Sequence, residues 1–224
     1  MDPKGKTALV TGAVQGIGLA ITKELLRQGV KGVSVCDVNA MKGMIVIQEL
    51  QEEFGKERVI FIKTDVTNEK EVEGICDESN WKRTVNVNMN GVIQGNLMAL
   101  KYMGKTRGGS GGVVVNVASV GGLVSIAAVA IYSATKSGII ALSRSLGVNA
   151  TDTEILSGLT NNELIPVDIG TVMSSNHSEI QKTESVSKGI LHIIREGNPG
   201  SIWISAKDKP VYEIKIPYYE DLKV

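Results

Sequence analysis

TALVTGAVQGIG, at residues 7–18, is the stretch of sequence that decides the fold. Residues 7–10 form a continuous apolar run, as is typical of a parallel strand buried on both faces. A glycine turn follows, and apolar residues then recur at helical spacing until a stop at Gly29. The sequence therefore predicts a strand, a tight turn and a helix in immediate succession.

The rest of the chain continues this alternation of strand and helix patterns. The further predicted elements are, in chain order, a strand at 33–38, a helix at 40–54, a strand at 59–62, a helix at 84–105, a strand at 111–117, helices at 130–146 and 185–195, and a strand at 201–205. Short links in the order β-α-β-α-β predict a parallel sheet with helices on both faces. The expected fold class is α/β, a doubly wound parallel sheet in a single domain over residues 1–224.

The charge and the apolar content of the sequence argue against some classes of binding partner. The 24 basic and 24 acidic side chains give a formal net charge of zero without a basic block, which argues against nucleic acid and anionic membranes as main partners. The longest apolar stretch, residues 121–132, is too short to span a membrane. Because the first residues lead directly into an apolar strand without a signal peptide, we expect a cytoplasmic protein.

Cysteines and histidines do not suggest a metal site. Cys36 and Cys76, the only two cysteines, lie 40 residues apart and lack the spacing of metal ligands. His177 and His192, the only histidines, lie in no metal or nucleophile motif. We expect two reduced thiols and no bound metal.

The glycine turn and an acidic residue together predict a dinucleotide site. Glycines here let the backbone approach a pyrophosphate, which the N–H groups and positive dipole end of the helix attract. Asp37 ends the second strand, 19 residues after Gly18. A carboxylate there accepts hydrogen bonds from ribose hydroxyls and repels a 2′-phosphate, so the expected cofactor is NAD rather than NADP. The alternatives are glycines that serve only helix–sheet packing and a solvated turn carboxylate.

A second group of residues suits proton transfer. Tyr132 and Lys136 are four residues apart and share one face of the predicted helix. A free tyrosine, with a pKa near ~10, is a poor base at neutral pH, but a lysine ammonium and an oxidised nicotinamide ring stabilise its phenolate. Ser119 follows the predicted strand, at the end where open α/β sheets bind ligands. The alternatives are that Tyr132 and Lys136 are an ordinary surface pair, as most such pairs are, and that Ser119 is only a turn residue.

These residues together resemble the classical short-chain dehydrogenase/reductase family, which has a Rossmann-type fold. The resemblance rests on Thr11-Gly12-x-x-x-Gly16-x-Gly18, Ser119 and Tyr132-x-x-x-Lys136. Residues 87–91, VNMNG, are similar to the family's active-site asparagine segment, and Asp65-Val66 is similar to its adenine-contacting pair. Residues 4–12 and 80–84 look most like NAD-dependent 15-hydroxyprostaglandin dehydrogenases and insect alcohol dehydrogenases.

The resemblance implies an oxidoreductase in which Tyr132 takes the proton of a substrate hydroxyl while hydride leaves for the nicotinamide. It implies that Ser119 holds the substrate oxygen and that Lys136 binds the nicotinamide ribose and depresses the pKa of Tyr132. It implies that Asn88 holds a water connecting Lys136 to solvent, and that the protein is a homodimer or homotetramer. The residues expected to bind NAD are Gly12, Gln15, Gly16, Ile17, Gly18, Asp37, Val38, Asp65, Val66 and Lys136.

The last third of the chain is expected to shape the substrate pocket. The family closes its pocket at a segment that corresponds to residues 151–182, which we therefore expect to be the substrate lid. Its many apolar residues suit an apolar or lipid-like alcohol or ketone, or simply pack a lid helix. Residues 206–224 are expected to be a C-terminal tail that crosses to a partner subunit, covers the pocket or forms an edge strand.

The sequence departs from the family at two places. Only 21 residues separate Val66 from Asn88, where the family has a helix, a central strand and a glycine turn, and a βαβ unit takes roughly 30 residues. A second shortening follows Leu146, where residues 147–153 look like pieces of the next strand. Either the chain is joined across segments that the protein possesses, or the protein lacks them. We favour the first, because the catalytic residues outside the gaps are intact; an intact mass near 23.9 kDa would establish the second.

Three functions follow from these observations. The first is an NAD-dependent alcohol dehydrogenase, which the intact serine, tyrosine and lysine favour. The second is a catalytically inactive nucleotide-binding or structural member of the same family, which the gaps favour. A nucleotide-sugar epimerase uses a related tyrosine and lysine pair, but it needs a larger C-terminal domain than the 77 residues after Gly147 allow.

Overall fold

The first half of the chain forms a three-stranded parallel sheet. The computed structural model describes residues 1–66, 79–124, 126, 129–148, 157–161 and 181–217. The strands β1 (Thr7–Thr11), β2 (Gly32–Asp37) and β3 (Val59–Lys63) pair in the order β1-β2-β3. All three lie within a residue of the predicted ranges, and their carboxyl ends meet at one edge of the sheet, where Thr11 lies opposite Cys36.

Two helices cover one face of this sheet. The helices α1 (Gly16–Arg27) and α2 (Ala40–Phe54) pack on it through a core that includes Leu26, Val35 and Leu50. The short 3-10 turn η1 (Lys56–Arg58) connects α2 to β3. The local pattern predicted these strands and helices, but it predicted β1 as a strand buried on both faces, whereas burial alternates along β1.

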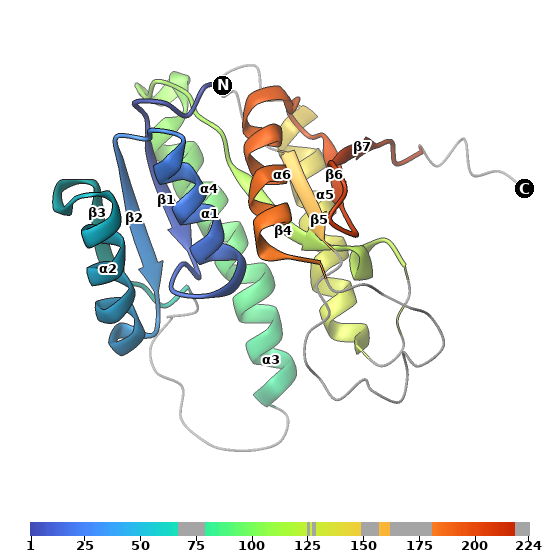
Figure 1. Cartoon of the computed structure of the whole chain (residues 1–224). Helices are drawn as coiled ribbons and strands as arrows, with labels where there is room; N and C mark the ends of the chain where they lie inside the picture. The colour runs from blue at the N-terminus through green and yellow to red at the C-terminus, as the bar shows by residue number, and fades with distance from the viewer. Residues whose placement is uncertain (67–78, 125, 127–128, 149–156, 162–180, 218–224) are drawn as a thin grey trace, which may run out of the picture.

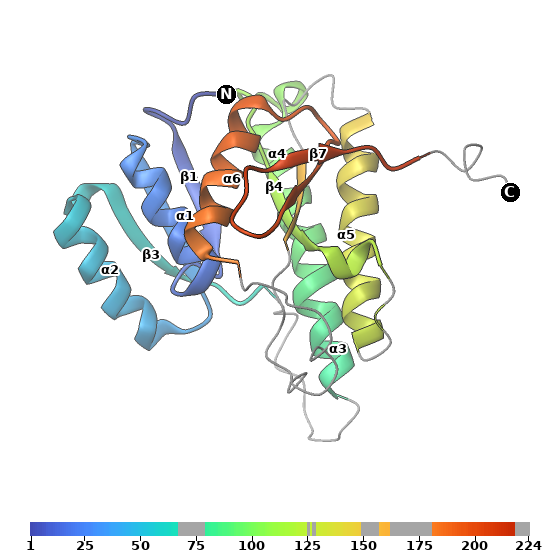
Figure 2. The same ribbon diagram turned by 45° about the vertical axis from the view of Figure 1, so that its right-hand side comes forward.

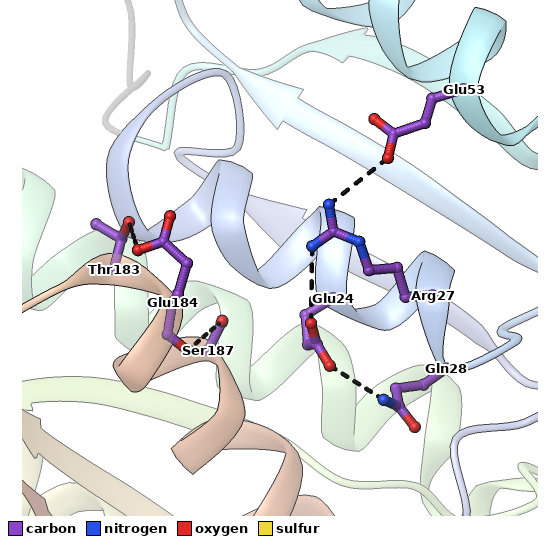
Figure 3. Close-up of polar contacts among 7 residues, drawn as sticks. All are labelled: Glu24, Arg27, Gln28, Glu53, Thr183, Glu184 and Ser187. Carbon is purple, nitrogen blue, oxygen red and sulfur yellow. Dashed lines mark hydrogen bonds and ion pairs between the residues drawn. The ribbon is translucent and has the colours of Figure 1, made fainter. Parts of the chain in front are cut away.

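An ion pair at the surface joins the same two helices, and a second one lies within α1. Arg27 of α1 lies 3.8 Å from the carboxylate of Glu24 and 3.6 Å from that of Glu53 on α2, and Gln28 donates to Glu24 (Figure 3). Exposed pairs of this kind contribute less than about 1 kcal/mol each. The apolar core, rather than these pairs, therefore holds α1 and α2 together.

The second half forms a four-stranded sheet. Its strands are β4 (Val115–Ser119), β5 (Ser157–Asn161), β6 (Ile202–Ser205) and β7 (Tyr212–Ile214), in that order. The first three are parallel, and β7 runs antiparallel as the last strand. The helix α6 (Thr183–Glu196) lies beside α1 (Figure 1).

The opposite side of β4 carries the other helices. The helix α5 (Ala130–Val148) packs there through Ile139, which contacts Ala118 of β4 within one core cluster. A nearly continuous helical segment lies beside it (Figure 2), and consists of α3 (Ser79–Val85), a π-helical turn η2 (Asn86–Asn90) and α4 (Gly91–Met103). Two 3-10 turns complete this half, η3 (Lys105–Arg107) and η4 (Val120–Gly122).

The sheet is interrupted between β1 and β4. These strands belong to different sheets, at the place where the sequence predicts a gap in the centre of a single sheet. Helices α1 and α6 pack against each other across the interruption, and Ile21 and Ile194 contact the core clusters of both halves. The α/β class and the parallel strand order are thus confirmed, together with the predicted gap.

The interruption leaves apolar side chains exposed on one face of the first sheet. Leu9 is 65% exposed and Ile60 is 55% exposed, although their neighbours Val10 and Val59 pack in the core beneath α1 and α2. The residues that follow β3 lie close to the start of α4, since a Cβ on Gly91 would come within 3.0 Å of Val66. Apolar side chains of the first sheet are therefore exposed on the face that α1 and α2 do not cover.

Because Leu9 is exposed, a substitution at this position can distinguish the two explanations of the gap. If the protein lacks the missing segments, Leu9→Lys is expected to change the free energy of unfolding by less than about 1 kcal/mol, as at other surface positions. If longer segments cover Leu9, the substitution buries a charge and lowers stability far more. Urea unfolding of the purified protein measures the difference, with Val35→Lys as a buried control.

Three predictions about local structure are corrected. The strand predicted at 111–117 is β4 at 115–119, because Gly111 has φ +77° and its N–H is bonded to the end of α4. Residues 157–161, predicted as part of the lid, form β5 inside the sheet. Residues 147–148 end α5 instead of opening the next strand. Residues 181–182 of the predicted lid come directly before α6, whereas residues 151–156 and 162–180 lie outside the described residues. Part of the predicted tail, residues 212–214, is the edge strand β7.

Candidate active site

The turn after β1 is shaped to let the backbone approach a ligand. Gly12 has φ +63°, a conformation that side chains with a Cβ rarely adopt. A Cβ on Gly18 would lie 2.2 Å from the carbonyl oxygen of Gly12, so the turn and the start of α1 are in direct contact. Gln15, the N-cap residue of α1, makes no side-chain cap, which leaves the first N–H groups of the helix for an anion.

Asp37 lies against this turn. One carboxylate oxygen accepts a hydrogen bond from the N–H of Val14 at 3.4 Å, and the other accepts one from Asn39 at 3.0 Å. The structure thus brings together the glycine turn and the acidic residue that the sequence separates by a whole helix. This is the arrangement expected of an adenosine ribose and pyrophosphate site.

Lys42 is a residue of this site that the sequence analysis missed. Its Nζ donates to Oε1 of Gln15 at 2.7 Å, and its backbone N–H is capped by the side chain of Asn39. The sequence could have indicated Lys42, because this residue lies in the first turn of the helix at 40–54. That turn begins at the same edge of the sheet as the glycine turn. A cation therefore lies beside the predicted ribose site, on the side of the turn that carries Gln15.

The other predicted cofactor residues lie around the same edge. Val38 follows Asp37 and is 56% exposed, and Asp65 is also exposed. Val66 contacts the position of Gly91 at the start of α4, and Gly16 has φ +52°. Ile17 packs instead against the core cluster of Trp203, so its side chain serves the contact between α1 and the second half.

Ser119 stands at the end of β4, where it is only 5% exposed. Its Oγ accepts a hydrogen bond from the N–H of Gly121 at 3.1 Å and so caps the 3-10 turn that follows. Ser119 is thus the last residue of the strand, rather than a residue beyond it as predicted. Strands β1, β2 and β4 all run downward in Figure 1. Asp37 and Ser119 are the last residues of β2 and β4, and Gly12 directly follows β1.

Tyr132 and Lys136 lie in the first two turns of α5. Nζ of Lys136 is 5.5 Å from the centre of the Tyr132 ring and donates a hydrogen bond to the carbonyl oxygen of Val117 at 3.0 Å. Val117 is two residues before Ser119 on β4. Lys136 therefore faces the ring of Tyr132, as expected. Its hydrogen bond to Val117 also joins the start of α5 to β4, the strand that ends in Ser119.

Asn88 approaches the same helix from the π-helical turn. Its Nδ2 donates to Oγ1 of Thr135 at 3.3 Å, and Thr135 in turn donates to the carbonyl oxygen of Tyr132 at 2.7 Å. Thr135, which is buried, is a second residue that the sequence analysis missed. Its position between the tyrosine and the lysine was the available signal. π-Helical turns occur frequently at functional sites, and this one carries the predicted asparagine.

Cys36 and His192 lie apart from Ser119, Tyr132, Lys136 and Asn88. Cys36 is buried next to Asp37, and burial raises the pKa of its thiol, while a hydrogen bond with Thr64 opposes this rise. His192 packs edge to face on Trp203, with 5.3 Å between the ring centres. Among the described residues there is no group of three or more His, Cys, Asp and Glu that could hold a metal ion. No described helix is both long enough and apolar enough to cross a membrane.

Solved structures share this architecture. The chain superimposes on a short-chain type dehydrogenase/reductase from Mycobacterium ulcerans with a TM-score of 0.74 at 22% identity, covering 91% of this chain and 89% of that one. This similarity defines the class of the fold, which is a Rossmann-type α/β fold.

Sequence comparison defines the family. The family model for short chain dehydrogenases matches residues 6–78 and 70–182, and the chain belongs to this family. It is 34% identical to rat 15-hydroxyprostaglandin dehydrogenase [NAD(+)] over 210 residues, which cover 85% of this chain and 77% of the relative. It is 27% identical to alcohol dehydrogenase 1 of Ceratitis cosyra, over 92% of this chain and 93% of the relative.

The family match also locates the main shortening. It falls into two parts that overlap at residues 70–78, between Val66 and Asn88, where the sequence analysis finds too few residues for a helix and a strand. The glycine turn and the candidate catalytic residues Asn88, Ser119, Tyr132 and Lys136 lie outside this overlap.

Proposed function

We propose that this protein is an NAD-dependent alcohol dehydrogenase. The observation that carries the proposal is the cluster at the start of α5, where the ammonium of Lys136 faces the ring of Tyr132 and is bonded to the strand that ends in Ser119. The reaction is the transfer of a hydride between a primary or secondary alcohol and NAD, with Tyr132 as the general base. Both halves of the fold then act as one catalytic domain.

Each residue of the cluster has a role in this reaction. Tyr132 takes the proton of the substrate hydroxyl, and Ser119 donates a hydrogen bond to the substrate oxygen. Lys136 stabilises the phenolate of Tyr132 and binds the nicotinamide ribose. Asn88, which is linked to α5 through Thr135, holds a water between Lys136 and solvent.

The residues around the glycine turn fit a dinucleotide. The close contact of Gly12 with Gly18 and the uncapped start of α1 suit the pyrophosphate, and Asp37 suits the ribose hydroxyls. When bound, NAD supplies the hydride acceptor for the reaction. The carboxylate of Asp37 repels a 2′-phosphate, so NAD is preferred over NADP.

Asp37 and Lys42 together determine this preference. Asp37→Ser is expected to raise the ratio of NADP to NAD affinity by about tenfold or more, because a negative charge facing the 2′-phosphate is removed while Lys42 remains beside the site. The dissociation constants of NADPH and NADH, measured by fluorescence titration, check this result. Adding Lys42→Ala in the same chain is expected to reverse part of the gain; an unchanged ratio in both variants would contradict the assignment.

The substrate is proposed to be an apolar or lipid-like alcohol or its ketone. A rat relative is named as a dehydrogenase of a hydroxyprostaglandin, and the segment 151–182 is rich in apolar residues. We also propose that the protein is a cytoplasmic homodimer or homotetramer, as expected from the resemblance of its sequence to the family.

Alcohol-dependent formation of NADH tests the proposal. The protein is expected to reduce NAD in the presence of secondary alcohols, with kcat/KM rising along a series of increasing chain length. Reduction of NAD that does not depend on the alcohol, or binding of NADH without any turnover across the series, would favour the catalytically inactive alternative.

A further inference from the structure

A buried polar network joins the three elements that carry the catalytic cluster. Asn96 of α4, Asn116 of β4 and Ser143 of α5 are 3%, 6% and 0% exposed. The amides of Asn96 and Asn116 bond reciprocally, with Nδ2 to Oδ1 distances of 2.9 and 3.2 Å. Nδ2 of Asn116 also donates to Oγ of Ser143 at 3.0 Å. Buried networks in which every amide hydrogen is used permit few alternative arrangements.

The network is the main buried anchor of α4. Asn96 is the only fully buried residue of this helix, and its Nδ2 also donates to the carbonyl oxygen of Val92. The large apolar residues Leu97, Met98 and Tyr102 of the same helix are 59%, 51% and 66% exposed. An amphipathic helix is normally held by its apolar face, whereas α4 contacts the core cluster of Ala118 through the half-buried Val92 and bonds to β4 through the fully buried Asn96.

The network lies at a constant depth below the catalytic cluster. Asn96 follows Asn88 by eight residues, Ser143 follows Lys136 by seven, and Asn116 precedes Ser119 by three. At the rise per residue of helices and strands, each of these separations is roughly 10–12 Å. Strand β4 and helix α5 therefore each carry one proposed catalytic residue and one network residue, and α4 carries Asn96 at a similar distance from Asn88 in the preceding turn η2.

We propose that Asn96, Asn116 and Ser143 are positioning residues, which set the place of Asn88 relative to Ser119 and Lys136. This inference rests on the proposed function. A slip of α4 by one residue turns Asn96 away from Asn116 and leaves buried amide groups unpaired, which is costly. The reciprocal amide bonds thereby select one position of the helix, and with it one position of the π-helical turn that contacts Thr135.

Hydrogen exchange of Asn96→Ala tests the positioning without using activity. Peptides from residues 86–103 are expected to exchange about tenfold faster than in the wild type, while peptides from residues 7–37 remain unchanged. Alanine is a good helix former, so the substitution removes the network but not the helix propensity. Met98→Ala, an exposed position on the same helix, is the matched control and is expected to leave both sets of peptides unchanged.

Kinetics separate positioning from general stability. In Asn96→Ala, kcat is expected to fall by about tenfold while KM for NAD changes by less than about twofold, since the glycine turn lies in the other sheet. Ser143→Ala removes one bond with little change of volume and is expected to act in the same direction more weakly. If Asn96→Ala does not fold, the exchange and kinetics of Ser143→Ala test whether the network positions Asn88.

Two results would overturn the inference: unchanged exchange at 86–103 in the folded variants, or faster exchange with kcat equal to that of the wild type. If the wild-type protein oxidises no alcohol, the proposed function fails separately. The exchange of residues 86–90 then decides alone whether the network holds the asparagine segment in place.

Discussion

Tyr132→Phe is expected to reduce alcohol-dependent NADH formation by about 10²–10⁴-fold, the usual contribution of a positioned general base. The phenyl ring fills the same space and still faces Nζ of Lys136, which lies 5.5 Å from the ring centre. Only the oxygen that accepts the substrate proton is lost. Steady-state kinetics give the loss in kcat/KM, and fluorescence titration is expected to show unchanged NADH affinity.

The chain contains a matched control for this substitution. Tyr102 of α4 also has a neighbouring lysine, with Nζ of Lys101 5.2 Å from its ring centre, but it is 66% exposed. Tyr102→Phe is expected to leave kcat/KM unchanged, which would show that a tyrosine beside a lysine is not sufficient for activity. If Tyr132→Phe keeps more than about a tenth of the wild-type rate, Tyr132 is not the general base.

Gly18→Ala is expected to impair both cofactor binding and stability. The added Cβ would lie 2.2 Å from the carbonyl oxygen and 2.8 Å from the carbonyl carbon of Gly12, and 3.0 Å from Cα of Ala13. These neighbours are backbone atoms, so α1 must move away from the turn to admit the methyl group. We expect a loss of about 1–3 kcal/mol in the free energy of unfolding, as for other overpacked sites, and a clear loss of NADH affinity.

Gly95→Ala on α4 is the control for this effect. A Cβ there meets no atom within 4 Å, and alanine is favoured over glycine in a helix by roughly 0.5–1 kcal/mol. Urea unfolding is therefore expected to show a gain in stability for Gly95→Ala and a loss for Gly18→Ala. Equal stability and equal NADH affinity in the two variants would refute the role assigned to the glycine turn.

One feature of the interrupted sheet, the gap, could be predicted from the sequence, and another, the strand β5, could not. Only 21 residues separate Val66 from Asn88, which is too short a chain for both a strand and a crossover helix, so the sequence predicted a gap in the sheet of this chain. The structure agrees, with β1 and β4 in different sheets. Local pattern did not predict β5, since its five residues have no alternation or apolar run, and only pairing with β4 and β6 makes them a strand.

The catalytic cluster divides in the same way. Ser119, Tyr132 and Lys136 could be proposed from the sequence, because the end of one strand and the face of one helix set where these residues lie. Lys42 and Thr135 were missed, because each acts through a neighbour that is distant in sequence: Lys42 through Gln15 and Thr135 through Asn88.

By itself, the sequence determined the order of strands and helices, the glycine turn with its acidic partner, and the spacing of the serine, tyrosine and lysine. These features depend on the periods of strand and helix and on the short-range geometry of turns, which neighbouring residues set. Only the tertiary structure decided the exposed face of the first sheet, the position of Lys42 beside the ribose site, and the bonding of Asn96 to Asn116. These features depend on which distant segments pack together, and no local period contains that information.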